Sequence, residues 1–172
     1  WACATAQAVS LVPIFAVFSL QWLIPYLSYA VLSNWEVDKL IAVGVSMALF
    51  VLSIPIMLVI GILTKWLVLG RLRPGEYPLW GFYFFRWWFV NRVLHTVPAH
   101  FFGGTPLMAL YYRLLGARIG RNVHLRDDTI DEPDCTEVGD DSSFAPGATL
   151  SCSKVENGRL KIGRVRVGRG CY

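Results

Sequence analysis

The residues best suited to chemistry lie in the last third of the chain, beginning with a histidine two residues after an asparagine. His124 follows Asn122 and stands between Val123 and Leu125. If the two aliphatic side chains point inward along an extended strand, both polar side chains point outward. An imidazole titrates near neutral pH, so His124 is a candidate general base, and the Asn122 amide is a candidate to orient a substrate or donate a hydrogen bond. The alternative is that His124 is simply solvated.

A dense group of acidic residues follows His124: Asp127, Asp128, Asp131, Glu132 and Asp134. One interpretation is a site that attracts a cationic amine, with the four aspartates as the substrate-binding residues. The other is a solvated loop of acidic turn formers. The residue types alone leave both interpretations open.

The remaining histidines and the cysteines suggest structural roles. His95 and His100 flank Pro98 in an aromatic segment, where a structural or interfacial role is expected for each. Three of the four cysteines recur in the last third, where a column of small half-buried thiols is expected: Cys135, Cys152 and Cys171. No C-x-x-C pair occurs, so we predict no metal site.

A six-residue rhythm organises the segment that carries these candidates. An aliphatic residue followed by glycine or another small residue recurs at or near multiples of six, as in Ile119-Gly120, Val138-Gly139, Phe144-Ala145, Leu150-Ser151 and Ile162-Gly163. This pattern is typical of a left-handed parallel β-helix built from hexapeptide repeats. We therefore predict a partial β-helix domain over residues 117–172, with residues 131–134 and 153–158 as loops that interrupt the coils.

The first 70 residues have the character of a membrane hairpin. The whole chain is 55% hydrophobic and only 16% charged, with a mean hydropathy of +0.47. Residues 8–32 contain no charge, and residues 40–64 form a second apolar run after a short polar turn. Each run exceeds the roughly 20 residues that a helix needs to cross a bilayer. We predict two transmembrane helices over residues 1–70, and the lipid bilayer as a partner.

The distribution of cations predicts the orientation of that hairpin. Lys39 is the one cation in the turn between the two apolar runs, whereas Lys65, Arg71, Arg73 and further arginines follow the second. The positive-inside rule places the chain after residue 65 in the cytoplasm. No Lys/Arg-rich run occurs, so nucleic acid is not an expected partner.

Between the hairpin and the six-residue rhythm, residues 71–116 form an aromatic linker that ends in a short helix. Its ring-rich part is interrupted by single cations such as Arg86 and Arg92. One interpretation is a helix in the headgroup plane with its rings toward the lipid. The alternative is a helix packed against the hairpin or the following domain. Pro106 and Gly116 are suited to the first turn and the C-cap of the short helix.

Several runs together resemble one family. They are residues 65–80 (KWLVLGRLRPGEYPLW), 85–88 (FRWW), 104–107 (GTPL) and 111–120 (YYRLLGARIG). This combination resembles the C-terminal region of nonribosomal peptide synthetases of the ε-poly-L-lysine synthetase type. In that family, pairs of membrane helices alternate with cytoplasmic domains related to hexapeptide acyltransferases. The resemblance is specific over about residues 65–147, and both chain ends are expected to lie within a longer polypeptide.

The resemblance implies an acyltransferase-like unit that forms amide bonds from an aminoacyl thioester. The thioester would be carried on the phosphopantetheine arm of a carrier domain, and no cofactor is expected to bind this segment itself. Adenylation and carrier domains of the same parent chain would be the partners, and the segment alone is expected to be inactive. Two alternatives stay open, namely a membrane acyltransferase that uses acyl-CoA and a non-catalytic scaffold for carrier domains. By analogy with hexapeptide enzymes, a homo-oligomer is also conceivable.

Overall fold

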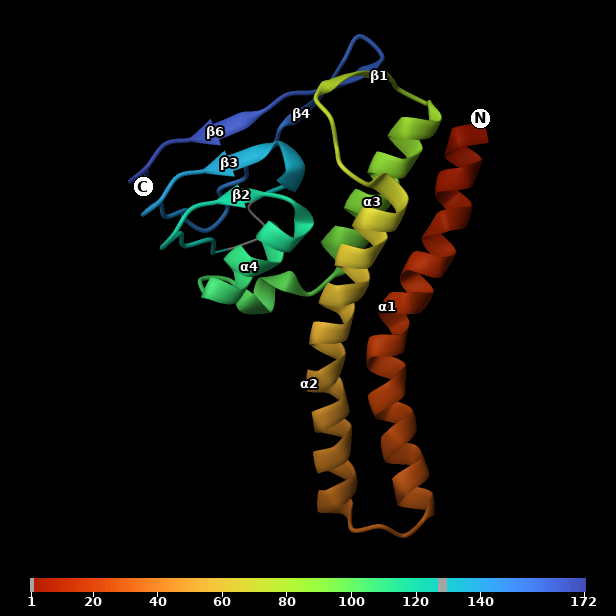
Figure 1. The fold of residues 1–172 in the computed structure, drawn as a ribbon. Helices are drawn as coiled ribbons and strands as arrows, with labels where there is room; N and C mark the ends of the chain where they lie inside the picture. The colour runs from red at the N-terminus through yellow and green to blue at the C-terminus, as the bar shows by residue number, and fades with distance from the viewer. Residues whose placement is uncertain (1, 127–129) are drawn as a thin grey trace.

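The protein is represented by a computed structural model that describes residues 2–126 and 130–172 (Figure 1). Its largest feature is a helical hairpin of α1 (Ala2–Asn34) and α2 (Lys39–Thr64). Asp38 begins the second helix, because its carboxylate accepts a hydrogen bond from the backbone N–H of Leu40 at 2.8 Å. Polar and aromatic contacts join the helices: the Ser28 and Ser46 hydroxyls are 3.1 Å apart, and the Trp22 ring packs on Phe50.

The hairpin helices are long and apolar enough to cross a membrane. Residues Cys3–Asn34 and Lys39–Leu69 form continuous helical segments of 32 and 31 residues, equivalent to about 46–48 Å at 1.5 Å per residue. Most large apolar side chains on the two helices are exposed, for example Val12, Ile41 and Val51. Such a surface is typical of helices that contact lipid.

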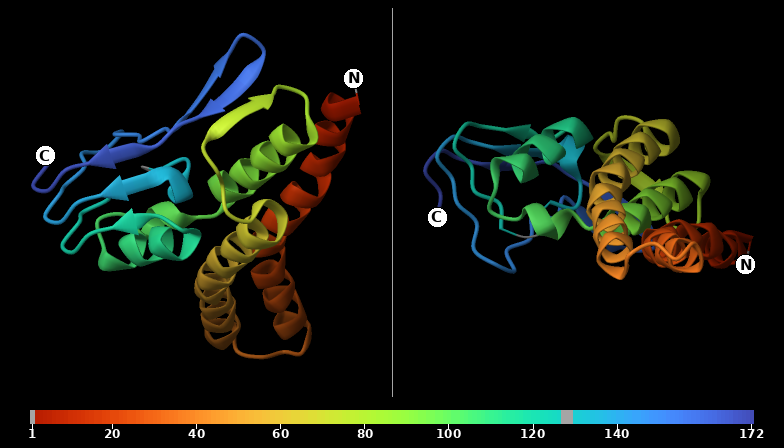
Figure 2. Two further views of the ribbon diagram at one scale, coloured as in Figure 1. Left: turned by 45° about the horizontal axis from the view of Figure 1, so that its top comes forward. Right: turned by 90° about the horizontal axis from the view of Figure 1, so that it is seen from below.

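Beyond α2 the helix continues as a π-helix, η1 (Lys65–Leu69), and ends at Gly70 with a positive φ of 68°. The chain then forms β1 (Gly75–Pro78) and enters α3 (Phe82–Thr96). Figure 2 shows α3 lying along the hairpin, where it contacts both α1 and α2. Phe84 and Val90 are its buried residues. Of the two placements considered for the aromatic segment, the structure has the one in which the helix packs against the hairpin.

A short 3₁₀ helix, η2 (Ala99–Phe102), leads into α4 (Pro106–Leu115). Pro106 occupies the first turn of α4, and Gly116 ends it in the left-handed region with φ of 110°. The left-handed backbone conformation disfavours a side chain at Gly116, and the space around it excludes one as well: a Cβ atom there would lie 2.2 Å from Oδ1 of Asp134. The conformation and the close contact together require glycine here.

In the described residues, β1 and the strands that follow α4 form two sheets of three strands each. The parallel sheet has the order β2 (Arg118–Ile119), β3 (Thr136–Val138) and β6 (Val165–Val167). The antiparallel sheet has the order β1, β5 (Arg159–Ile162) and β4 (Ser153–Glu156). A 3₁₀ turn, η3 (Pro133–Cys135), immediately precedes β3.

The predicted β-helix is wrong, because the described part of residues 117–172 forms no solenoid. Asn157 and Gly158 both have positive φ, 50° and 69°, and they join β4 to β5 in a tight hairpin. An Asn-Gly pair between alternating residues favours such a two-residue turn. The segment predicted to be an extruded loop is therefore β4 and its turn, the outer strand of an antiparallel sheet in which β5 pairs with both β4 and β1. This sheet interrupts any regular stacking of coils.

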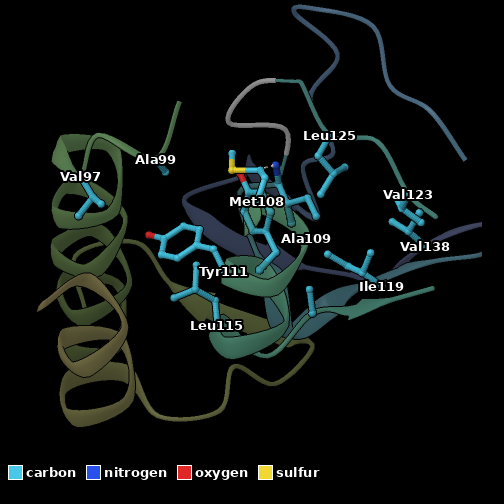
Figure 3. Close-up of a cluster of buried hydrophobic side chains, with 13 residues drawn as sticks. Val97, Ala99, Met108, Ala109, Tyr111, Leu115, Ile119, Val123, Leu125 and Val138 are labelled. Carbon is cyan, nitrogen blue, oxygen red and sulfur yellow. Dashed lines mark hydrogen bonds between the residues drawn. The ribbon is translucent and has the colours of Figure 1, made fainter. Parts of the chain in front are cut away.

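The six-residue pattern has another explanation in the structure. Ile119, Leu125 and Val138 are buried, as predicted, but the helix α4 covers them through Met108 and Leu115 (Figure 3). Isolated parallel bridges at His124–Ser143 and Ile130–Leu150 extend the pairing only locally. Any strand that packs against a core on one face needs aliphatic side chains that alternate with polar ones. The six-residue pattern therefore fits a sheet covered by a helix as well as it fits a β-helix.

Candidate functional site

A cleft lies where α3 meets the segments that precede β3 and begin β4. Its volume is about 250 Å³. One wall comes from α3. The other comes from Asp131 and Glu132, which precede β3, and from Ser153 at the start of β4. The lining residues are Trp87, Trp88, Asn91, Arg92, His95, Asp131, Glu132 and Ser153.

Glu132 is the most unusual of these residues, because it is a carboxylate with only 2% of its surface exposed. Its Oε2 accepts a hydrogen bond from the backbone N–H of Cys152 at 2.7 Å. Its backbone carbonyl accepts from Cys135 N and from Thr136 Oγ1 at the η3 turn. These contacts hold the residue in place from two sides. Among the described residues, the second carboxylate oxygen, Oε1, has no hydrogen-bond partner.

Burial raises the pKa of the Glu132 carboxyl above its ordinary value of 4.5. The nearby Ser153 hydroxyl, the Cys152 N–H and the Trp87 indole oppose the increase, while the negative charge of Asp131 adds to it. The Trp87 indole N–H is likewise buried, with no hydrogen-bond partner in the described chain. Glu132 and Trp87 therefore lie beside each other at the cleft, and each has a buried polar atom without a hydrogen bond among the described residues.

Groups of both charges surround this pair. Asp131 and Glu132 supply negative charge, whereas Arg92 lies with its guanidinium 5.7 Å from the centre of the Trp88 ring. His95 is exposed on the same helix, one turn after Asn91. A carboxylate that holds its proton more tightly than usual is suited to proton transfer near neutral pH, and acids beside aromatic rings suit a cationic amine. In the part of the chain that the structure describes, no three His, Cys, Asp or Glu residues are grouped to hold a metal ion.

The raised pKa of Glu132 predicts a pH-dependent stability. The folded protein binds the Glu132 proton more tightly than the unfolded chain does, so stability falls as pH rises from about 4.5 toward the folded pKa. Each tenfold difference in proton affinity corresponds to about 1.4 kcal/mol. We expect Glu132→Gln to flatten this decline in thermal melts recorded from pH 4 to pH 8. Parallel curves for the two proteins would contradict the shift.

The candidates from the sequence occupy three different places. His124 and Asn122 are exposed and do not line the cleft. The His124 backbone pairs with Ser142 and Phe144, and the Asn122 amide donates to Asp141 Oδ1 at 3.0 Å. Asn122 has φ of 55°, a conformation that asparagine tolerates better than most residues. Their catalytic role stays a prediction.

The predicted acidic group is divided by the fold. Asp131 lines the cleft. Asp134 instead forms a buried ion pair with Lys65, at 2.8 Å between Oδ2 and Nζ, and also accepts from the Leu72 N–H at 2.9 Å. Asp127 and Asp128 lie outside the described residues. The binding role of these aspartates stays a prediction, although the partners of Asp134 show that its side chain is already engaged.

Sequence reasoning did not select the two residues that the structure brings to the cleft, Glu132 and His95. Glu132 stood among five clustered acids with no local sign that it was the buried one. The Glu-Pro step at residues 132–133 was a usable signal, because proline starts a turn that fixes the preceding residue. No local signal places α3 beside residues 131–132.

The two buried cysteines, Cys135 and Cys152, are not candidates for a thiolate nucleophile. Burial raises the pKa of the Cys135 thiol to about 11, and burial also raises the pKa of Cys152. Both are free thiols, and the Cys152 sulfur lies 3.3 Å from Thr136 Oγ1. A thiol with a raised pKa is protonated and unreactive at neutral pH.

Comparison with known proteins finds a relative over the whole length of this chain. The chain is 31% identical over 173 aligned residues to a delta-poly-L-ornithine synthetase of Acinetobacter baumannii (strain AB307-0294). The chain is therefore similar to a segment of that synthetase. The alignment covers 100% of this chain but 13% of the relative, so the chain spans about an eighth of that protein's length. No protein-family model matches the chain, and no solved structure matches it significantly.

Proposed function

We propose that this chain is a membrane-embedded segment of a nonribosomal peptide synthetase, and that the Glu132 cleft receives the amine that forms the amide bond. The whole-length similarity to a polyornithine synthetase supports the class of enzyme. The observation that carries the site is the buried Glu132 at the cleft, whose carboxylate has one oxygen, Oε1, without a hydrogen bond among the described residues. Burying an unpaired carboxylate oxygen is costly, and a bound amine would offset that cost.

The reaction would join an amine to an aminoacyl thioester carried on phosphopantetheine. The amine nitrogen attacks the thioester carbonyl, so a C–N bond forms and the C–S bond breaks. The nitrogen gives up a proton, and the departing thiolate takes one, so the two protons balance. Glu132 accepts the proton from the amine, because burial has raised the pKa of its carboxyl toward the range useful for a base. The proton then passes to the thiolate.

The surrounding residues have defined roles in this scheme. Asp131 adds negative charge that attracts a cationic amino acid, as a diamino acid such as ornithine requires. Trp87 lies beside the Glu132 carboxylate, and its indole N–H would hold that carboxylate in position. The hairpin anchors the cleft beside the membrane, and the excess of cations after residue 65 favours the cytoplasmic face, where adenylation and carrier domains of the parent chain would supply the thioester.

The test uses the full-length parent synthetase with ATP and ornithine. Glu132→Gln keeps the size and the acceptor for the Cys152 N–H but removes the base, so we expect product formation to fall about 100-fold or more. Loading of the carrier with amino acid should be unchanged. Glu137→Gln is the matched control, because Glu137 pairs with Arg118 and Arg166 on the exposed sheet surface.

The outcomes separate the proposal from its alternatives. Full activity of the folded Glu132→Gln protein would refute the role of the cleft. If His124→Ala abolishes product formation while Glu132→Gln does not, the sequence-based site is the correct one. If neither substitution reduces product formation, the segment acts as a scaffold rather than as a catalyst.

A further inference from the structure

The underside of α4 presents a row of apolar side chains that the rest of the protein leaves uncovered. Leu107, Leu110 and Leu114 recur at the spacing of one helix face. Together with Phe101 of η2 they are 47% to 59% exposed. The opposite face of α4 packs into the core through Met108 and other buried residues. This helix is therefore apolar on both sides, which a helix with water on its outer face would not be.

The same row borders a large apolar groove against α2. The groove has a volume of about 1000 Å³, and its lining contains no charged residue. Its α2 wall extends from Met47 to Ile62, and its other wall consists of η2 and α4. Figure 1 shows α4 beside the upper part of α2, with the hairpin continuing well below it. The groove thus runs from α4 along the apolar surface of the hairpin.

The position of α4 along α2 matches the thickness of a membrane. From Leu40, near the start of α2, to Ile62, beside α4, the helix rises about 33 Å over 22 residue steps. The hydrocarbon core of a bilayer is about 30 Å thick. If the turn at residues 34–38 lies at one membrane surface, α4 lies at the other.

We propose that the leucine row of α4 and the groove beside it rest on the bilayer, so that lipid acyl chains occupy the groove and α4 lies in the membrane surface. This inference rests on the proposed membrane insertion of the hairpin. The bilayer is the occupant that fits, because the apolar surface is continuous with that of α2 and carries no charge for a protein partner to match. Trp66, in the π-helix that continues α2, connects that helix to α4: its indole N–H donates a hydrogen bond to the Leu114 carbonyl at 2.9 Å.

Polar groups on α4 point away from the proposed lipid surface. The Arg113 guanidinium donates to the carbonyls of Ile119 and Gly120, which belong to the sheet region. The buried ion pair of Lys65 and Asp134 likewise lies at the end of α2, beyond the groove. An interfacial helix is expected to have its apolar face toward the lipid and cations on the side away from it. The leucine row of α4 and the cations Arg113 and Lys65 have this arrangement.

Photocrosslinking in lipid nanodiscs tests the inference. Benzoylphenylalanine is placed separately at Leu110, at Ile24 on α1 and at Val155 on β4, three apolar positions of similar exposure. The chain is reconstituted in phosphatidylcholine with phosphatidylglycerol, irradiated and analysed by mass spectrometry. We expect lipid adducts at Leu110 with a yield close to that at Ile24 and several-fold above that at Val155.

The two control positions distinguish failure of this inference from failure of membrane insertion. Adducts at Ile24 but not at Leu110 would overturn the placement of α4 and leave the membrane hairpin intact. Adducts at neither position would overturn both. Crosslinks from Leu110 to another protein chain, in place of lipid, would show that the row is a protein interface and would also overturn the proposal.

Discussion

Replacement of Asp134 by alanine is expected to lower the free energy of unfolding by about 3–5 kcal/mol, the largest effect of any single substitution considered for this chain. Asp134 and Lys65 each have side chains only 2% exposed. Removing the carboxylate leaves a buried ammonium without its counter-ion and leaves the Leu72 N–H without its acceptor. The measurement is the thermal or denaturant midpoint of the protein in micelles.

Two further variants separate the ion pair from general damage. Lys65→Met combined with Asp134→Leu removes both charges, and we expect it to recover a substantial part of the lost stability. Arg118→Ala breaks an exposed ion pair with Glu137 and should cost less than about 1 kcal/mol. If Asp134→Ala costs no more than Arg118→Ala, the buried pair does not fasten the hairpin to the sheet region.

Replacement of Leu160 by alanine is expected to cost about 2–5 kcal/mol. Leu160 is fully buried in β5, in the cluster that joins the antiparallel sheet to α3 and to the end of α2. Truncating Leu160 leaves a cavity among side chains from several elements, which cannot easily move together to fill it. The measurement is the denaturant midpoint of the variant compared with that of the parent protein in micelles.

The matched control lies on the same hairpin. Val155 pairs directly with Leu160 across the two strands but is 53% exposed. Val155→Ala should therefore change stability by no more than about 0.5 kcal/mol. The two side chains share one face of the sheet, and Val155 is more exposed because β4 is the outer strand. Equal effects at the two positions would mean that the central strand β5 is no better packed than the outer strand β4.

The sequence predicts those features that depend on neighbouring residues alone, such as the length of an apolar helix and the residues at its ends. Long uncharged stretches predict helices of membrane-spanning length, and the structure has two helices of that kind. Pro106 and Gly116 correctly predict the ends of α4, since one fits the first turn and the other tolerates a positive φ. The Asn157-Gly158 turn is equally local, but residues 153–158 were predicted to be a loop rather than a hairpin strand and its turn. Periodic aliphatic residues report burial on one side of a strand, not how strands stack.

The site depended on contacts that no local pattern encodes. The acids between residues 127 and 134 look alike in sequence, but Asp134 is neutralised by Lys65, 69 positions earlier, while Glu132 is capped by Cys152, 20 positions later. His95 and Trp87 reach Glu132 because α3 folds back along the hairpin. The chain by itself determined the apolar spans and the supply of acids. Only tertiary packing decided that Glu132 is the acid that is buried with one carboxylate oxygen lacking a hydrogen bond. The reason is that desolvation depends on all the elements packed around a side chain.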